Sequence, residues 1–169
     1  MSDVGQSLIE EARRRLLQHF PDQVRACLDA LSDEDLWWRP HESSNSVGNL
    51  VLHMCGSSRH FIGRGVGESD YRRDRPGEFS ERGPVPRAEL QRVLEETVAE
   101  TARVLDALTP ERLRETTDRA GDEQTIQYLV SRTSHHWAVH TGQIVYITKL
   151  RNAGALNELW ERTLNSSGR

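Results

Sequence analysis

Residues 134–150 read SHHWAVHTGQIVYITKL, and this stretch decides the fold class because it is long, amphipathic and free of proline. Its histidines His136 and His140 are four residues apart, which places both imidazoles on one face of a helix. His135 points about 100° away and is not expected to join them. Apolar residues continue at helical spacing on the N-terminal side, so the pattern predicts a helix over about residues 123–150.

Two series of residues with a seven-residue spacing run along this expected helix: Ile126, Thr133, His140 and Ile147, and Leu129, His136, Gln143 and Leu150. Adjacent a- and d-type positions of this kind form the inward seam of a bundle helix. Both histidines are therefore expected to face the protein interior. Buried ring nitrogens need partners there, either hydrogen-bonding groups or a metal ion.

The rest of the chain also reads as helices joined by loops, with no convincing strand and no internal repeat. Pro21 predicts a kink or break near Phe20, and the glycines at 63, 65 and 67 are expected to end the second long helix. The Gly- and Pro-rich residues 65–86 predict a long loop. Four long helices predict an all-α four-helix bundle. Besides 123–150, the expected helices cover residues 4–30, 44–64 and 87–108, with a short terminal helix over 153–164.

Composition fits one soluble domain over residues 1–169. A net charge of −4 argues against nucleic acid as a partner, because phosphate binding needs a basic surface. No apolar run reaches the roughly 18 residues of a membrane span, and the N-terminus lacks the apolar core of a secretory signal. Cys27 and Cys55 form no motif, so a reduced cytoplasmic setting is expected.

A third imidazole that can join the pair is His53, on or beside the inward stripe of the second expected helix. Together with His136 and His140 it would form a half-shell around a divalent metal and leave a position open, as in a catalytic site. Three neutral imidazoles suit Zn²⁺, Ni²⁺, Cu²⁺ or Fe²⁺ rather than Ca²⁺ or Mg²⁺. The alternative is a set of core histidines that are satisfied by hydrogen bonds, and the spacing alone does not decide between them.

Neighbouring polar residues are candidates to support such a site. Asn49 lies one turn before His53 and Gln143 one turn after His140, where each can orient an imidazole. The alternative for both is a capping or interface amide, which is favoured for Asn49. Arg59 and Arg64, near the end of the second helix, are candidates to bind a substrate carboxylate, against the alternative of a solvated charge.

These motifs resemble the DinB/YfiT-like superfamily, and an uncharacterised branch of it. The resemblance rests on SNSVGNLVLHMCG at 44–56 together with HHWAVHTGQIVYITKL at 135–150. The segments LWWRP at 36–40 and DRPGEFSERGPVPRAEL at 74–90 extend it over about residues 5–160. It implies a four-helix bundle of unusual helix order, often a homodimer, with a divalent metal held by three histidines. The matching positions are His53, His136 and His140.

The resemblance also implies classes of activity. Characterised relatives include transferases that attach a low-molecular-weight thiol to electrophiles, and a thiol-dependent isomerase. The expected function is therefore metal-dependent activation of such a thiol, or of water, toward a small-molecule substrate. The expected cofactors are Zn²⁺ or Ni²⁺ and a low-molecular-weight thiol. The alternatives are a non-catalytic metal-binding, stress-associated dimeric bundle and a metal-free bundle with structural histidines.

Overall fold

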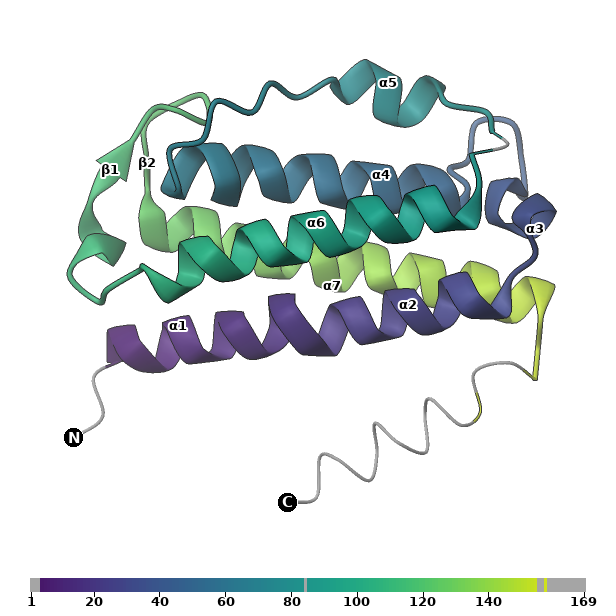
Figure 1. The fold of residues 1–169 in the computed structure, drawn as a ribbon, viewed down its shortest axis with the longest axis horizontal. Helices are drawn as coiled ribbons and strands as arrows, with labels where there is room; N and C mark the ends of the chain where they lie inside the picture. The colour runs from purple at the N-terminus through teal and green to yellow at the C-terminus, as the bar shows by residue number, and fades with distance from the viewer. Residues whose placement is uncertain (1–3, 84, 155–156, 158–169) are drawn as a thin grey trace.

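Four long helical segments lie side by side in the computed structural model, which describes residues 4–83, 85–154 and 157 (Figure 1). The predicted all-α bundle is confirmed. The first segment comprises α1, η1 and α2, the second comprises α4 and η2, and α6 and α7 form the other two. Their bounds are Val4–Arg14 (α1), Arg15–His19 (η1), Phe20–Ala30 (α2), Val47–Ser58 (α4), Arg59–Val66 (η2), Arg87–Asp106 (α6) and Ile126–Arg151 (α7).

The helices predicted over 87–108 and 123–150 agree with α6 and α7 to within three residues. Thr125 caps the start of α7 by accepting a hydrogen bond from the backbone N–H of Tyr128. The short helix Asp33–Trp37 (α3) begins at the N-cap Ser32. The terminal helix expected over 153–164 lies largely outside the described residues.

Pro21 does not break the first segment, which continues past it as helix. Proline has no N–H, and its ring crowds the carbonyl four residues earlier. The chain widens into the π-helical turn η1, Arg15–His19, and then continues as α2. The irregularity expected near Phe20 is therefore this wider turn, which ends immediately before that residue.

The second segment ends two residues later than predicted, at Val66. Ser46 caps α4 in a capping box with Asn49, and the π-helical η2 continues to Val66. Of the three glycines that were expected to end this helix, Gly67 does so as its C-cap, whereas Gly63 and Gly65 lie inside η2. A Cβ atom at Gly63 would overlap the Glu100 carboxylate, so the missing side chain lets α6 approach closely.

Two loop predictions also need correction. Residues 65–86 contain the short helix Arg75–Ser80 (α5), which Asp74 caps by accepting a hydrogen bond from the backbone N–H of Gly77. The connection after α6 contains the turn Arg112–Arg114 (η3) and a small antiparallel ladder, Thr116–Thr117 (β1) with Gln124–Thr125 (β2). The absence of strands was therefore predicted wrongly, because a two-residue ladder leaves no alternating pattern to detect.

The buried face of α7 departs from the seven-residue seam. Gln143 is exposed and Leu150 is 53% exposed. The buried positions instead repeat at eleven residues, a spacing of about 3.67 per turn that is close to that of a straight α-helix. This drift moves His136 and His140 from the core to its edge, where both are half-buried. The repeat consists of Ile126, Trp137 and Thr148, with Val130 and Thr141, and Thr133 and Ile144.

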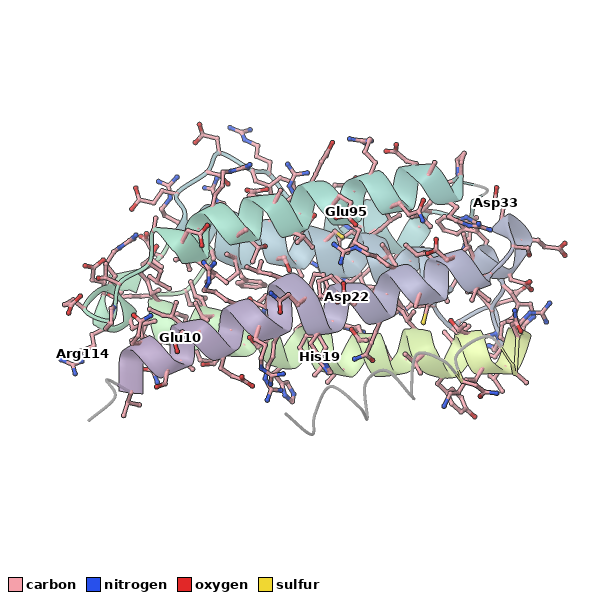
Figure 2. The ribbon with its side chains drawn as sticks, turned by 60° about the horizontal axis from the view of Figure 1, so that its bottom comes forward. Glu10, His19, Asp22, Asp33, Glu95 and Arg114 are labelled. Carbon is pink, nitrogen blue, oxygen red and sulfur yellow. The ribbon has the colours of Figure 1, made fainter. Side chains whose placement is uncertain are left out.

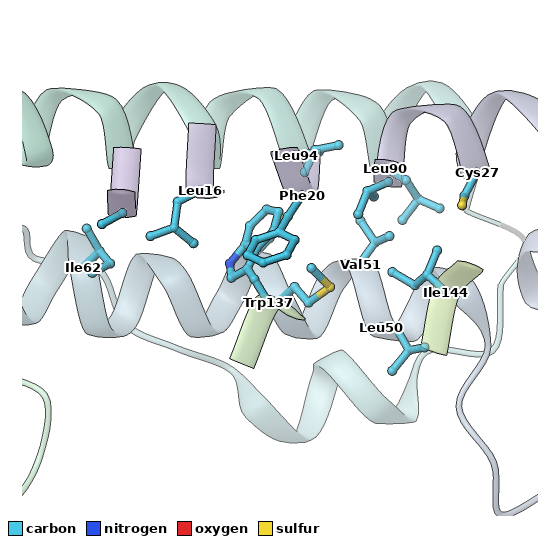
Figure 3. Packing of buried hydrophobic residues seen from close by; sticks show 14 of the residues in the cluster. Leu16, Phe20, Cys27, Leu50, Val51, Ile62, Leu90, Leu94, Trp137 and Ile144 are labelled. Carbon is cyan, nitrogen blue, oxygen red and sulfur yellow. The ribbon is translucent and has the colours of Figure 1, made fainter. Parts of the chain in front are cut away.

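The apolar core lies between the four segments. Figure 3 shows Trp137 and Ile144 of α7 in the cluster that includes Phe20, Leu50 and Leu94. The Trp137 ring is 1% exposed, and its Nε1 donates to Ser58 Oγ at 2.6 Å. This bond satisfies the indole N–H and ties α7 to α4 beside the histidines.

Ion pairs cross the outer surface. Arg25 of α2 contacts Asp22 on its own helix and Glu95 on α6, and Figure 2 shows these two acidic residues on facing helices. The Glu95 contact is bidentate, with N–O distances of 2.7 and 2.8 Å. Among the described residues, no helix is both long enough and apolar enough to span a membrane.

Candidate metal centre

The packing of α4 against α7 brings together the three histidines singled out in the sequence. One nitrogen from each of His53, His136 and His140 can be chosen so that all three lie within 4.8 Å of one another. The Nε2 atoms of His53 and His136 are 2.9 Å apart. His53 is 7% exposed, whereas His136 and His140 are half-buried. The cluster therefore sits at the edge of the core, within reach of solvent.

Glu78 fixes the orientation of His53. Its Oε2 lies 2.9 Å from His53 Nδ1, so that nitrogen donates to the carboxylate and Nε2 is left toward the other histidines. Arg73 binds the same carboxylate through two N–O contacts of 2.7 Å. The Arg73 Nη2 atom is also 3.0 Å from His53 Nδ1. Glu78 is thus a buried carboxylate with two partners.

The local sequence explains how Glu78 reaches this position. Asp74 caps α5, Pro76 suits its first turn, and the helix lies along α4. The Phe79 ring packs against His53 with centroids 4.6 Å apart. Gly56 faces Glu78, and a Cβ atom there would overlap the carboxylate. Burial would raise the pKa of Glu78, but the hydrogen bonds from His53 and Arg73 outweigh it and lower the pKa, which keeps the group ionised.

His140 is also oriented by a hydrogen-bond partner, which lies on its own helix. Its Nδ1 lies 2.7 Å from Gln143 Oε1, which leaves Nε2 available. Burial lowers the pKa of His140, although Gln143 opposes the shift. The pKa of His136 falls to about 3 through burial and then through its neighbours His140 and His53. Both rings are therefore held in the neutral form that binds metals.

His136 also carries an unused polar atom. Its Nδ1 is buried and has no hydrogen-bond partner among the described residues. A buried imidazole normally has both nitrogens paired, so the ring as it stands lacks one interaction. Three neutral imidazoles, two of them oriented by acceptors on the far nitrogen, fit a divalent ion that prefers nitrogen ligands. The donor set contains no carboxylate, which argues against Ca²⁺ or Mg²⁺.

Asn49 supports the site from a distance. Its Nδ2 donates to the backbone carbonyls of Glu78 and Glu81 at 3.0 Å each, and its Oδ1 accepts from Arg39 at 2.6 Å. It therefore anchors the segment that carries Glu78, and it forms the capping box of α4 with Ser46. This is the capping and interface role that was favoured for Asn49 from the sequence.

The two arginines expected near the site are already engaged. Arg59 pairs with Glu100 at 3.0 Å and stacks over the Tyr71 ring at 4.6 Å. Arg64 donates to the Arg119 carbonyl at 2.8 Å. Arg73 and Glu78 belong to a mixed-charge stretch that the sequence predicts to be an exposed loop or a substrate lid, and their role beside His53 was missed. No signal in the sequence pointed to Glu78, because its burial depends on the packing of α5 against α4.

Two solved structures share this fold at low sequence identity. A DinB-like protein from Bacillus subtilis, YjoA, is 19% identical with a TM-score of 0.64, covering 83% of this chain and 92% of its own. A DinB-like protein from Bacillus cereus is 16% identical with a TM-score of 0.61, covering 80% of this chain and 90% of its own. No curated protein matches the chain.

Family membership follows from the sequence itself. The model of a family described as a protein of unknown function, DUF1572, matches residues 3–160. This range includes all three histidines and the α5 segment that carries Glu78. The fold agrees with the resemblance to DinB-like proteins, and the chain belongs to the DUF1572 family, whose members are described as proteins of unknown function.

Proposed function

We propose that this protein is a metal-dependent enzyme that binds one divalent ion, Zn²⁺ or Ni²⁺, through His53, His136 and His140 and acts on a small molecule. The observation that carries the proposal is the convergence of three imidazole nitrogens within 4.8 Å. A bound ion would supply a Lewis acid that favours the deprotonated, nucleophilic form of a low-molecular-weight thiol or of water.

The chain's own residues prepare the site for such an ion. Glu78 and Arg73 hold His53 in one orientation, and Gln143 holds His140. Fixed imidazoles lose less conformational freedom when they bind a metal, so the partners raise the affinity. Because His136 and His140 are half-buried, a small molecule can approach from their side.

The chain's two cysteines do not provide the nucleophile. Cys27 and Cys55 are free and buried, and burial raises their pKa values to about 11 and about 12. A thiol held so far above neutral pH stays protonated, and the thiolate is the reactive form. This supports a nucleophile that comes from outside the chain, either a small thiol or water.

A spectroscopic titration tests the thiol proposal. The Co²⁺-substituted protein is titrated with glutathione, cysteine and other physiological low-molecular-weight thiols, and the visible spectrum is recorded. Thiol activation predicts a new sulfur-to-cobalt absorption band and consumption of thiol in the presence of a small electrophile. His53→Ala should abolish both. A spectrum unchanged by every thiol would contradict thiol activation and leave water as the nucleophile, to be tested by hydrolysis.

We also propose the homodimer that the resemblance implies. Large apolar side chains are exposed along one side of α7, namely Val139 (46%), Tyr146 (65%) and Leu150 (53%). A cluster of this kind is a common feature of protein interfaces. Sedimentation of the wild-type protein and of Tyr146→Glu tests this: the variant should associate more weakly, and a monomeric wild type would contradict the proposal.

A further inference from the structure

Arg132 is a cation beside the histidine cluster that has no counter-charge. It lies one helical turn before His136 on α7. Within residues 4–83 and 85–154, no carboxylate forms an ion pair with it, whereas Arg59, Arg73 and several surface arginines each pair with a glutamate. Its Nη1 atom is buried and has no hydrogen-bond partner in that part of the chain. A half-buried guanidinium with no carboxylate partner and one unsatisfied N–H group is costly to desolvate.

The Arg132 side chain is held in place by an aromatic ring. Its guanidinium carbon stacks over the Phe61 ring of η2, 3.7 Å from the centroid. Stacking fixes the plane of the guanidinium and leaves its edge for a planar or tetrahedral anion. The Tyr128 phenol, one turn earlier on α7, is hydrogen-bonded to the Arg132 side chain. A neutral phenol does not balance the charge.

Other positive groups lie around Arg132. The positive charges of Arg132 and Arg73 both help to lower the pKa of His136. The same two charges, together with that of Arg64, help to lower the pKa of His60. Among the residues that the structure describes, Glu78 is the one buried carboxylate, and it is already paired with Arg73. The side of the histidine cluster toward Arg132 therefore carries an excess of positive charge, which a bound divalent ion would increase. Anions are attracted to such a surface.

We propose that Arg132 binds the anionic group, a carboxylate or phosphate, of the small molecule that reaches the histidine centre. The role of this anion as a substrate rests on the proposed function, but the binding of an anion by Arg132 does not require the metal. The proposal names the substrate class as a small organic anion with an apolar part, because the Phe61 ring stacks on Arg132 and the Phe79 ring packs against His53. Arg132 takes the role that the sequence had offered to Arg59 and Arg64.

Binding of simple probes tests the proposal. Phenylacetate, phenyl phosphate and the neutral phenylacetamide are titrated into metal-free and Co²⁺-loaded protein by calorimetry, and the cobalt spectrum is followed in the loaded form. Wild type should bind at least one of the two anions about tenfold or more tightly than the amide. The two anions distinguish a carboxylate site from a phosphate site.

Variants of Arg132 distinguish anion binding by this side chain from anion binding by the metal ion. Arg132→Gln should weaken anion binding about 10- to 100-fold without changing the cobalt content, and Arg132→Lys should lie between it and wild type. Arg103→Gln is the matched control, because Arg103 is exposed on α6 and forms no ion pair within the described residues. Circular dichroism checks that each variant is folded.

The outcomes distinguish the two proposals. Anion binding that depends on Arg132 in a protein that takes up no metal would support the anion site and contradict the metalloenzyme. Metal uptake with anion binding equal in wild type and Arg132→Gln would overturn the anion site and leave the metal proposal standing. Equal affinity of wild type for anion and amide, or no binding of either anion, would also overturn the role of Arg132.

Discussion

Glu78 Oε2 lies 2.9 Å from His53 Nδ1, so a residue from a Gly- and Pro-rich connection orients a histidine of the central bundle. Part of this connection folds into α5, which Asp74 caps and Pro76 favours, and the Phe79 ring of α5 packs against His53. The bond also selects which ring nitrogen faces the other histidines. The metal proposal therefore extends to residues outside the histidine motif.

Glu78→Gln should weaken metal binding about 10- to 100-fold, the usual cost of losing a carboxylate that orients a metal-bound histidine. An amide keeps the shape of the side chain but removes the charge that makes His53 a better ligand. Affinity is measured by competition with a chromophoric chelator. Glu10→Gln, on the exposed face of α1, is the control and should bind metal like wild type. Equal affinities in the two variants would contradict the assigned role of Glu78.

Two glycine substitutions should have opposite effects. Gly56→Ala places a Cβ against the Glu78 carboxylate, so it should displace Glu78, weaken metal binding and lower the free energy of unfolding by about 1–3 kcal/mol. Gly142→Ala meets no described atom within 4 Å and lies inside α7, so it should raise stability by about 0.5–1 kcal/mol. Chemical denaturation and metal titration measure both. Loss of stability in Gly142→Ala would show that another segment or a second molecule covers that face.

Both thiols should be unreactive in the native protein. Burial raises the pKa of Cys55 to about 12 and that of Cys27 to about 11, and the two side chains are 1% and 0% exposed. Ellman's reagent at pH 8 should therefore report almost no thiol until denaturant is added, and then two per chain. Rapid reaction of a native thiol would contradict the packing of α4 and α2 described above.

The metal-free protein should lose stability as the pH falls from about 7.5 to 5.5. Burial, followed by His140 and His53, holds the pKa of His136 at about 3, below the ordinary 6.5. As the pH falls, His136 takes up a proton in the unfolded chain before it does so in the folded chain. The stability that depends on the neutral ring is therefore fully present above pH 6.5 and is lost as the pH falls toward 3. Since the ring is half-buried, the loss by pH 5.5 should stay below about 1 kcal/mol. Urea unfolding should show a smaller loss in His136→Gln, and an equal loss would contradict the shifted pKa.

Local spacing was sufficient to predict the bundle and the pairing of His136 with His140, whereas the choice of His53 as their partner also drew on the resemblance to a known family. Helical periodicity identified α6 and α7 to within a turn, and Ser46 marked the start of α4. The inward seam of α7 was only partly right, because a seven-residue repeat assumes a supercoil. The helix instead follows an eleven-residue repeat that leaves Gln143 and Leu150 exposed.

The supporting residues could not be found from local patterns. Glu78 reaches His53 across 25 positions of the chain, and its neighbours have the composition of an exposed loop. Arg132 looks like any helical arginine in the sequence. What distinguishes it is that no described carboxylate forms an ion pair with it, and that depends on how α7, η2 and the Arg73 segment pack together.

The metal content of the protein tests the central claim most directly. Protein purified without a metal-affinity tag is analysed by elemental mass spectrometry, beside a His136→Ala/His140→Ala double variant whose helical content is checked. The account predicts about one equivalent of zinc or nickel per chain in the wild type, or stoichiometric uptake on addition, and neither in the variant. A wild type that holds no metal and takes up neither Zn²⁺ nor Ni²⁺ would contradict it.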